Sequence, residues 1–485
     1  MTFEIVFVLL SLLGMVAALI ADKMRPGMIL FSVVVLFLCA GILTPKEMLE
    51  GFSNKGMITV ALLFLVSEGI RQSGTLGQVI KKLLPQGKTT VFKAQLRILP
   101  SVAFISAFLN NTPVVVIFAP IIKHWAKSVN LPATKFLIPL SYVTILGGIC
   151  TLIGTSTNLV VHGMILEAGF EGFSMFELGK VGVFIAIAGI IYIFLFSKRL
   201  LPDARPDTAV PDEEIEEGEK FHRVEAVLGA RFPGINKKLK DFNFQRHYGA
   251  EVKEIKTRNG QRFVTNLDDV VLHEGDTLVV MADDTFIPTW GESSVFVLLT
   301  NGNEPDTSGK KKRWFALLLL VLMIVGATVG ELPVTKEMFP DIKLDMFFFV
   351  SITTIIMAWT NLFPARKYTK YISWDILITI ACAFAISKAM VNSGVADSVA
   401  KFIIGLSDDY GPHVLLAMVF IITNLFTELI TNNAAAALAF PLALSISAQL
   451  GVSPTPFFVV ICMAASASFS TPIGYQTNLI VQGIG

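Results

Sequence analysis

Long runs of apolar residues, separated by short polar segments, fill both ends of the chain. Each is close to or longer than the roughly 20 apolar residues that span a bilayer as a helix. The runs cover residues 3–21, 27–42, 57–72, 98–122, 136–165, 176–197, 314–330, 344–363, 373–392, 412–447 and 455–484. The pattern predicts an all-α polytopic membrane protein, because in lipid a helix satisfies its own backbone hydrogen bonds.

Charge divides the chain into three parts. Of its 485 residues, 53% are hydrophobic and 16% are charged, which excludes a soluble enzyme and a disordered protein. Residues 201–310 hold 34 of the 77 charged residues. We therefore expect a first transmembrane repeat at 1–200, a soluble insert at 201–311 and a second repeat at 312–485. The net charge of +1 gives no reason to expect a nucleic-acid partner.

The insert begins with an acidic linker, residues 203–219, and continues with short β-like runs. These are Val224–Leu228, Ala250–Thr257, Gln261–Thr265, Asp276–Met281 and Val295–Thr300. Asn259-Gly260 between two of them is a hairpin signal. The insert is therefore predicted to be a small α/β domain. Lysine and arginine counts place it in the cytoplasm, provided that 98–122 enters and leaves the membrane on one side.

The two membrane segments share motifs at a shift of about 320 residues. Phe64–Gly74 matches Phe384–Gly394, and Asn110-Asn111-Thr112 matches Thr431-Asn432-Asn433. Ile153–Gly163 matches Ile473–Gly483. With the charge-derived topology, the copies face opposite ways across the membrane. Inverted repeats with broken helices are typical of secondary transporters that bind substrate near the midplane.

The polar triplets predict helix breaks within apolar runs. Thr112 suits a helix cap and Pro113 a first turn, so one helix should end and another begin there. The expected structures are two re-entrant hairpins with tips at mid-depth, followed by broken helices at 154–158 and 471–478. Free N–H groups at such breaks attract anions, while carbonyl and Asn oxygens suit Na⁺. The alternative is that the Asn and Thr side chains only hold helices together.

Ionisable side chains inside the apolar runs are further candidates for function. Glu68 and Lys388 occupy equivalent positions of the copies, and Glu428 lies four residues before Asn432. Glu68 and Lys388 could form an ion pair. Alternatively, Glu68 and Glu428 lie near an interface or in a wet cavity and have no specific role, and both interpretations stay open.

The duplicated tips resemble the Ser-Asn-Thr tips of the divalent anion–sodium symporter family, the sodium–dicarboxylate and sodium–sulfate carriers. The resemblance covers both membrane segments and implies Na⁺ sites on the two tips and the loops after them. The implied Na⁺ ligands are Asn110, Asn111, Gly154 and Asn158 in the first copy, and Thr431, Asn432, Gly474 and Asn478 in the second. The implied substrate contacts are Asn111, Thr112, Thr155, Asn432, Asn433 and Thr471.

The tips differ from the family pattern, since they read Asn-Asn-Thr and Thr-Asn-Asn. Asn433 in place of Thr departs from the dicarboxylate carriers. The two tips, together with a cytoplasmic insert, resemble the branch associated with sulfate more closely. The insert resembles a TrkA-C domain over Phe242–Ala250 and Leu272–Leu278. Such domains dimerise or bind small ligands, so the resemblance implies a homodimer and a small regulatory ligand. We expect a bacterial inner (plasma) membrane as the location.

The resulting hypothesis is Na⁺-coupled symport of a small divalent oxyanion, with sulfate favoured, by alternating access. A Na⁺-coupled dicarboxylate transporter is the alternative, and an ion channel gated by the cytoplasmic lobe is a further class. An enzyme is not expected, because the spans contain no nucleophile–base pair. A last helix near 496–517, equivalent to 176–197, is expected from the repeat but is missing from the sequence.

Overall fold

The structure is a computed structural model, and it describes most of the chain. The described residues are 3–21, 23–203, 221–229, 231–257, 261–283, 286–290, 295–300, 310–405, 411–470 and 474–484. The expected Asn259-Gly260 turn and the Thr471 contact lie outside them, as does most of the acidic linker.

The first membrane segment consists of helices α1–α10. They are α1 (Phe3–Ile20), α2 (Pro26–Cys39), α3 (Pro45–Glu50), α4 (Lys55–Gln72), α5 (Thr75–Leu83), α6 (Val91–Ser106), α7 (Asn111–Ser128), α8 (Thr134–Gly148), α9 (Ser156–Glu167) and α10 (Gly179–Leu200). The apolar run 98–122 is split between α6 and α7, and the run 136–165 is split between α8 and α9. Both breaks lie where the polar motifs predicted them.

The second membrane segment consists of helices α13–α22. They are α13 (Lys310–Gly330), α14 (Pro333–Met338), α15 (Met346–Trp359), α16 (Tyr368–Tyr371), α17 (Trp374–Asn392), α18 (Val395–Gly405), α19 (Gly411–Leu429), α20 (Asn432–Leu450), α21 (Thr455–Ser466) and α22 (Gln476–Ile484). Here α19 and α20 share one apolar run, and α21 and α22 share another. The order of the breaks is the same as in the first segment.

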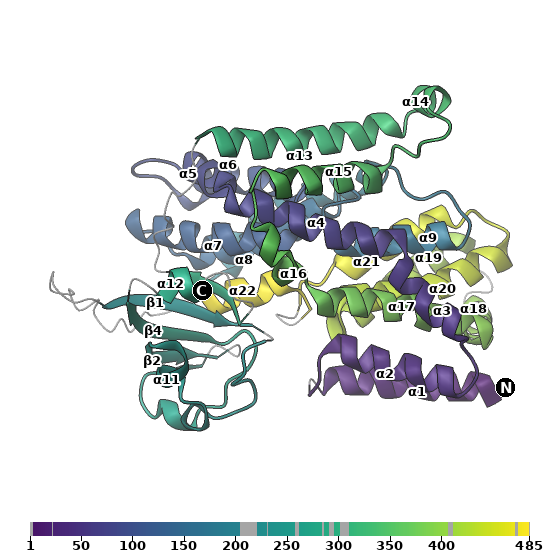
Figure 1. The fold of residues 1–485 in the computed structure, drawn as a ribbon, viewed down its shortest axis with the longest axis horizontal. Coiled ribbons are helices and arrows are strands. Elements are labelled where there is room, and N and C mark those ends of the chain that lie inside the picture. Colours follow the sequence, from purple (N-terminus) through teal and green to yellow (C-terminus); the bar gives the residue numbers. More distant parts are fainter. Residues whose placement is uncertain are drawn as a thin grey trace.

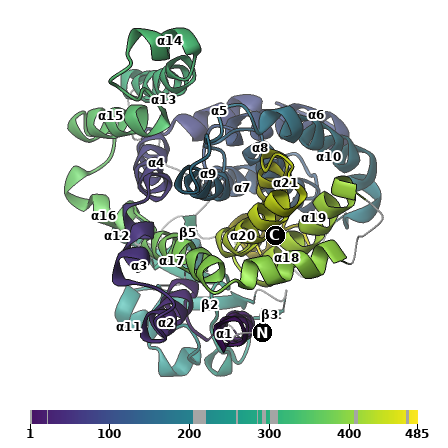
Figure 2. The ribbon, with the colours of Figure 1, turned by 90° about the vertical axis from the view of Figure 1, so that its right-hand side faces the viewer.

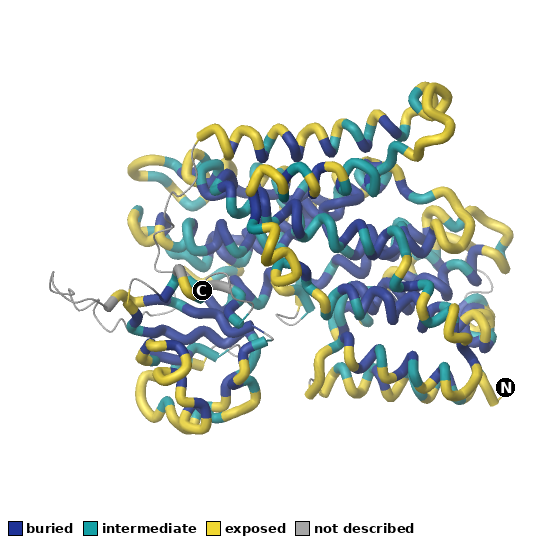
Figure 3. The backbone as a smooth tube through the Cα atoms, viewed as in Figure 1, coloured by how far each residue is buried: buried dark blue, intermediate teal, exposed yellow. Residues whose placement is uncertain are grey.

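Burial separates an outer set of helices from an inner set. In the described part of the chain, seven helical stretches are long and apolar enough to cross a membrane, α1, α10 and α13 among them. These three expose many large apolar side chains, whereas α8, α17 and α20 are mostly buried (Figure 3). An exposed apolar face suits contact with lipid. The protein is thus a polytopic membrane protein with a buried helical interior.

The insert forms one antiparallel sheet with short helices. Its elements are β1 (Phe221–Leu228), α11 (Phe244–Tyr248), β2 (Glu251–Lys256), β3 (Arg262–Phe263), β4 (Thr277–Asp283), α12 (Phe286–Trp290) and β5 (Phe296–Thr300). The strand order is β3-β2-β4-β1-β5. The pairs Ile255–Phe263 and Lys256–Arg262 confirm the predicted β2–β3 hairpin. All five predicted strands are present, and aromatic side chains such as Phe232 and Phe296 pack in their core.

The sheet contacts the membrane helices through α7 and α22 (Figure 1). Lys123 Nζ of α7 lies 3.1 Å from Glu225 Oε1 of β1 and donates to the Ile484 carbonyl of α22 at 2.7 Å. Thr277 Oγ1 of β4 donates to the Gly483 carbonyl at 2.8 Å. The insert therefore contacts two of the helices that begin at a chain break.

The pair Glu68–Lys388 is not formed. Both Glu68 carboxylate oxygens accept from Arg71, one turn further along α4, at 2.7 and 2.8 Å. Glu68 is thus paired within its own helix, and its equivalence to Lys388 in the repeat produces no contact between these two described residues.

Candidate functional site

Four helices begin at the four chain breaks, and their N-termini face one another in pairs. Thr112 Oγ1, in the first turn of α7, donates to Gln476 Oε1 of α22 at 3.2 Å. Asn433 Oδ1, in the first turn of α20, accepts from Thr157 Oγ1 of α9 at 3.2 Å and from Ser156 Oγ at 3.3 Å. Each pair joins one membrane segment to the other. The first turns of α7, α9, α20 and α22 therefore surround one place in the interior.

The side chain of Asn111 is fully buried at this place. Its amide is satisfied when the oxygen accepts from the Tyr475 hydroxyl at 2.6 Å. The nitrogen then faces Ser106 Oγ at 2.7 Å and the carbonyls of Thr144 and Gly154 at 3.1 and 3.3 Å. Asn111 thus ties the first hairpin tip to the loop of the α8–α9 pair.

The second tip repeats part of this arrangement. Thr427 Oγ1 donates to Asn432 Oδ1 at 2.8 Å, five residues along, as Ser106 contacts Asn111 five residues along in the first copy. Each tip is therefore stabilised by a hydroxyl on the last turn of the preceding helix. This hydroxyl fixes the orientation of the central Asn.

Tyr475 links the two halves of the site. Its hydroxyl lies 3.0 Å from Thr155 Oγ1 and is also hydrogen-bonded to the side chain of Asn432. Together with the Asn111 contact, one phenol joins both hairpin tips and the first loop. Tyr475 occupies the position that matches Thr155 in the repeat, so the aligned Gly-Thr-Ser and Gly-Tyr-Gln triplets were the signal for it.

The loops are held by matching Asn side chains. Asn158 Nδ2 donates to the Thr151 carbonyl at 2.9 Å and to the Gly148 carbonyl at 3.3 Å. Asn478 Nδ2 donates to the Ser468 carbonyl at 2.9 Å, which is again ten residues back along the chain. The Asn478 oxygen accepts from Ser141 Oγ at 2.7 Å. Both residues thus fold a loop back onto the helix that follows it.

Several buried oxygens at the site have no protein partner among the described residues. They are Asn158 Oδ1, Thr431 Oγ1, Ser466 Oγ and Ser468 Oγ. A buried oxygen without a partner costs about 1–3 kcal/mol, and amide and hydroxyl oxygens are suitable ligands for a hard cation. The donors present therefore fit Na⁺. Asn158 belongs to the first predicted ligand set and Thr431 to the second.

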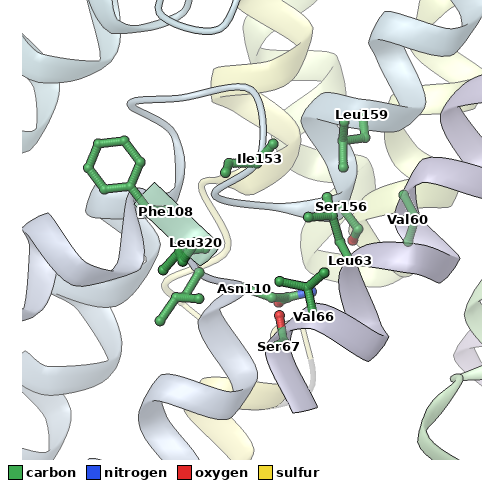
Figure 4. Close-up of a pocket in the computed structure, with 11 residues that line it drawn as sticks. Val60, Leu63, Val66, Ser67, Phe108, Asn110, Ile153, Ser156, Leu159 and Leu320 are labelled. Carbon is green, nitrogen blue, oxygen red and sulfur yellow. The ribbon is translucent and has the colours of Figure 1, made fainter. Parts of the chain in front are cut away.

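Asn110 lies beside a small cavity of about 10 Å³ (Figure 4). Ser67 of α4 and Ser156 of α9 also line it. A volume of this size holds roughly one water molecule. Asn110 therefore shares its cavity with the loop-to-helix junction of the α8–α9 pair, as the first ligand set requires, but its side chain does not enter the Asn111 network. Ser67 was not expected from the sequence.

Close approach of the backbone requires glycine beside Asn111. A Cβ added at Gly148 would lie 2.6 Å from the Asn111 side-chain amide, and one at Gly154 would lie 2.4 Å from the Gly148 carbonyl oxygen. Gly154 therefore lets the loop fold tightly onto the end of α8. The Gly154 carbonyl can then face the hairpin tip.

Glu428 has a positioning role. Its Oε1 accepts from the backbone N–H groups of Phe469 and Ser470 at 3.0 and 3.1 Å. Tyr142 holds the same loop from the first segment, because its hydroxyl donates to the Phe469 carbonyl at 2.9 Å. Phe469 and Ser470 are thus held from both membrane segments.

The predicted substrate contacts are brought together in part. Tyr475 joins Asn111, Thr155 and Asn432. Thr112 contacts Gln476, whereas Asn433 contacts Ser156 and Thr157. Ser106, Ser141, Thr427 and Tyr475 were missed by the sequence analysis. Isolated hydroxyls such as Ser106, Ser141 and Thr427 are common in apolar helices, so only their positions relative to the tips could have indicated them. The aligned triplets could have indicated Tyr475.

Comparison with known proteins identifies the family. The family model described as "CitMHS: Citrate transporter" matches residues 16–461. The chain belongs to this family. It is a transporter and not an enzyme, and the membership agrees with the expected likeness to divalent anion–sodium symporters.

Three named relatives are similar to this chain, two of them over most of its length and one over a quarter of it. An uncharacterized transporter of Synechocystis, sll0640, is 29% identical over 93% of this chain and 88% of its own length. A probable sodium/sulfate cotransporter 3 of Chlamydomonas reinhardtii is 23% identical over 96% of this chain and 83% of its own. A sodium-dependent dicarboxylate transporter of Staphylococcus saprophyticus, SdcS, is 28% identical over 24% of this chain and 23% of its own.

Proposed function

We propose that this family member is a Na⁺-coupled symporter of a small divalent oxyanion, with sulfate as the favoured substrate. The observation that supports the proposal most directly is the meeting of four helix N-termini, those of α7, α9, α20 and α22, around Asn111 and Tyr475. Each such terminus presents backbone N–H groups and about half a positive charge. A dianion placed among them receives donors from both membrane segments.

Na⁺ completes the charge balance. Moving a dianion into the membrane interior is costly without compensating charge, and neither tip motif contains Lys or Arg. The unpartnered oxygens of Asn158 and Thr431 suit a cation beside each tip. Bound Na⁺ then raises the affinity for the anion, and the anion raises the affinity for Na⁺ by the same factor. More than two Na⁺ per anion would make uptake sensitive to membrane potential, by about 2.3 kcal/mol per charge per 100 mV.

Alternating access follows from the arrangement of the halves. In Figure 1, α8 lies to the left of α9, whereas α21 lies to the right of α22. This placement supports an inverted repeat, in which one set of broken helices would open the site to each side in turn. The relatives with sodium/sulfate names support sulfate, and the dicarboxylate relative supports the alternative. The domain limits, the cytoplasmic insert in a bacterial inner membrane, the homodimer and a regulatory ligand at the TrkA-C-like insert remain predictions.

The deciding experiment is uptake into proteoliposomes. Labelled sulfate, succinate and citrate would be offered with an inward gradient of either Na⁺ or K⁺. We expect sulfate uptake that depends on Na⁺ and that unlabelled sulfate inhibits. Sulfate uptake that is equal in both cations would contradict symport, and saturable succinate uptake alone would establish the dicarboxylate alternative. Single-channel currents would instead support a gated channel.

A further inference from the structure

A crevice of about 580 Å³ lies between the insert and the membrane helices. It is lined by Thr431, Asn433 and Gln476, which belong to the candidate site. It is also lined by Arg231 and Asn236 of the insert, and Asn236 is exposed. The site is therefore connected to the surface of the molecule on the side of the insert.

Among the described residues that line the crevice, basic side chains outnumber acidic ones. Lys23, Arg25, Arg231 and Lys370 line it together with Glu274 and Asp375, so four formal positive charges face two negative ones. Arg25 and Arg231 both attract the carboxylate of Asp375, at the start of α17, by coulombic interaction. Lys23 and Lys370 are exposed. The described lining of the crevice thus has an excess of two positive charges.

The insert and the membrane helices both contribute to this surface. Arg231 follows β1, whose Glu225 is paired with Lys123 of α7. Lys23 and Arg25 lie between α1 and α2, and α2 packs along α17 (Figure 2). The position of Arg231 relative to the other basic groups therefore depends on the contact between the insert and α7.

We propose that the crevice is a vestibule that collects small oxyanions for the site, and that Arg231 makes the insert one wall of it. A cleft lined by an excess of one charge focuses the electric field and raises the local concentration of ions of opposite sign. The insert then influences transport directly, because the Arg231 guanidinium attracts the anion. This effect is separate from any ligand that the insert binds. The identity of the anion rests on the proposed function, but the electrostatic role does not.

The test measures the electrostatic potential in the crevice by a method that does not require transport. In a background with Cys39→Ala and Cys150→Ala, which removes the exposed and the half-buried thiol, Ile376→Cys places a probe on the crevice wall. The protein in detergent is treated with anionic and cationic methanethiosulfonates of similar size. The ratio of the two rates is compared with that of a free thiol. We expect the ratio to favour the anionic reagent by at least about threefold at low salt, and less at 0.5 M KCl where screening is strong.

Arg231→Gln with Lys370→Gln should return the ratio to that of the free thiol. The matched control is Arg246→Gln with Lys253→Gln, which removes the same charge from exposed positions of the insert outside the crevice. Gel filtration and melting curves check folding of both. A ratio equal to the free-thiol value, or one lowered equally by the control pair, would overturn the proposal. If the ratio of modification rates depends on the crevice charges but the protein does not take up sulfate, the proposed substrate is wrong and the vestibule proposal stands.

Discussion

The hydroxyl of Tyr475 lies 2.6 Å from the side-chain amide of Asn111, 364 residues earlier in the chain. Asn111 is fully buried at the first hairpin tip, and Tyr475 immediately precedes α22 in the second segment. The contact therefore couples a break in one membrane segment to a break in the other. Any movement that separates the two segments at the site has to replace this hydrogen bond, for which a bound oxyanion is a suitable acceptor.

Tyr475→Phe should weaken anion binding. The change removes the hydroxyl that would donate to the bound oxyanion, and a hydrogen bond to a charged group contributes about 1.5–3 kcal/mol. This loss corresponds to roughly a ten- to 150-fold decrease in affinity. The measurement is the concentration dependence of labelled sulfate uptake at saturating Na⁺. Tyr192→Phe, on an exposed part of α10, is the control and should behave as the wild type. Unchanged kinetics in Tyr475→Phe would show that the phenol has no role in binding.

Asn158→Ala should directly weaken the binding of Na⁺ and not that of the anion. The Asn158 oxygen is buried and has no partner among the described residues, whereas the equivalent Asn478 oxygen accepts from Ser141. Loss of one neutral oxygen ligand should raise the Na⁺ concentration for half-maximal uptake by roughly tenfold, on the scale of one hydrogen bond to a charged group. Asn158→Asp keeps a ligand oxygen and should retain more Na⁺ affinity. Equal Na⁺ titrations for Asn158→Ala and wild type would exclude a ligand role.

The contact between the insert and α7 should depend on pH through Glu225. Burial raises the pKa of Glu225, but Lys123, Lys256 and Arg223 outweigh this effect and hold the pKa below its ordinary value of 4.5. A lowered pKa in the folded state stabilises it above the unfolded pKa, and this stabilisation is lost as the pH falls through the folded value. The contribution should therefore be complete at pH 7 and decline below about pH 4.5.

Glu225→Gln provides the measurement. Removing one partner of a largely buried pair should destabilise the protein by about 1–3 kcal/mol at neutral pH, which is less than for a fully buried pair. The difference in melting temperature from wild type should shrink between pH 5 and pH 3.5. Glu251→Gln, at an exposed position of β2, is the control. A difference that is constant over this pH range would contradict the assigned role of Glu225.

The helix breaks were predictable because triplets of consecutive polar residues interrupt the apolar runs where the backbone leaves the helix. Asn110-Asn111-Thr112 and Thr431-Asn432-Asn433 mark the two tips, and the structure begins α7 at Asn111 and α20 at Asn432. The strands of the insert were predictable for a similar reason, since their apolar runs are bounded by turn residues. Local chemistry determined both features.

The partners across the site were not predictable in the same way. Tyr475 contacts Asn111 and Thr155 only because α22 packs on α7 and α8, which is a property of the assembled helices. The failed pairing of Glu68 with Lys388 has the same origin, because equivalence in a repeat does not make two residues neighbours. The docking of the insert through Lys123 and Glu225 joins polar residues that have no shared motif.

Asn433→Thr should shift the substrate preference from sulfate towards dicarboxylates. Asn433 fills the third position of the second tip, where the resembled carriers have Thr, and its oxygen accepts from Ser156 and Thr157. A shorter hydroxyl side chain leaves more space between α20 and α9 and releases two hydroxyl donors, which a longer anion with two separated carboxylates can use. We expect the ratio of succinate to sulfate uptake, each as kcat/KM, to rise by at least about tenfold, since a site built to hydrogen-bond its substrate discriminates strongly between partners. Asn433→Ala creates the space without the hydroxyl and should lower sulfate uptake with little gain for succinate. If both variants lose the two substrates in equal proportion, Asn433 supports the tip and does not select the anion.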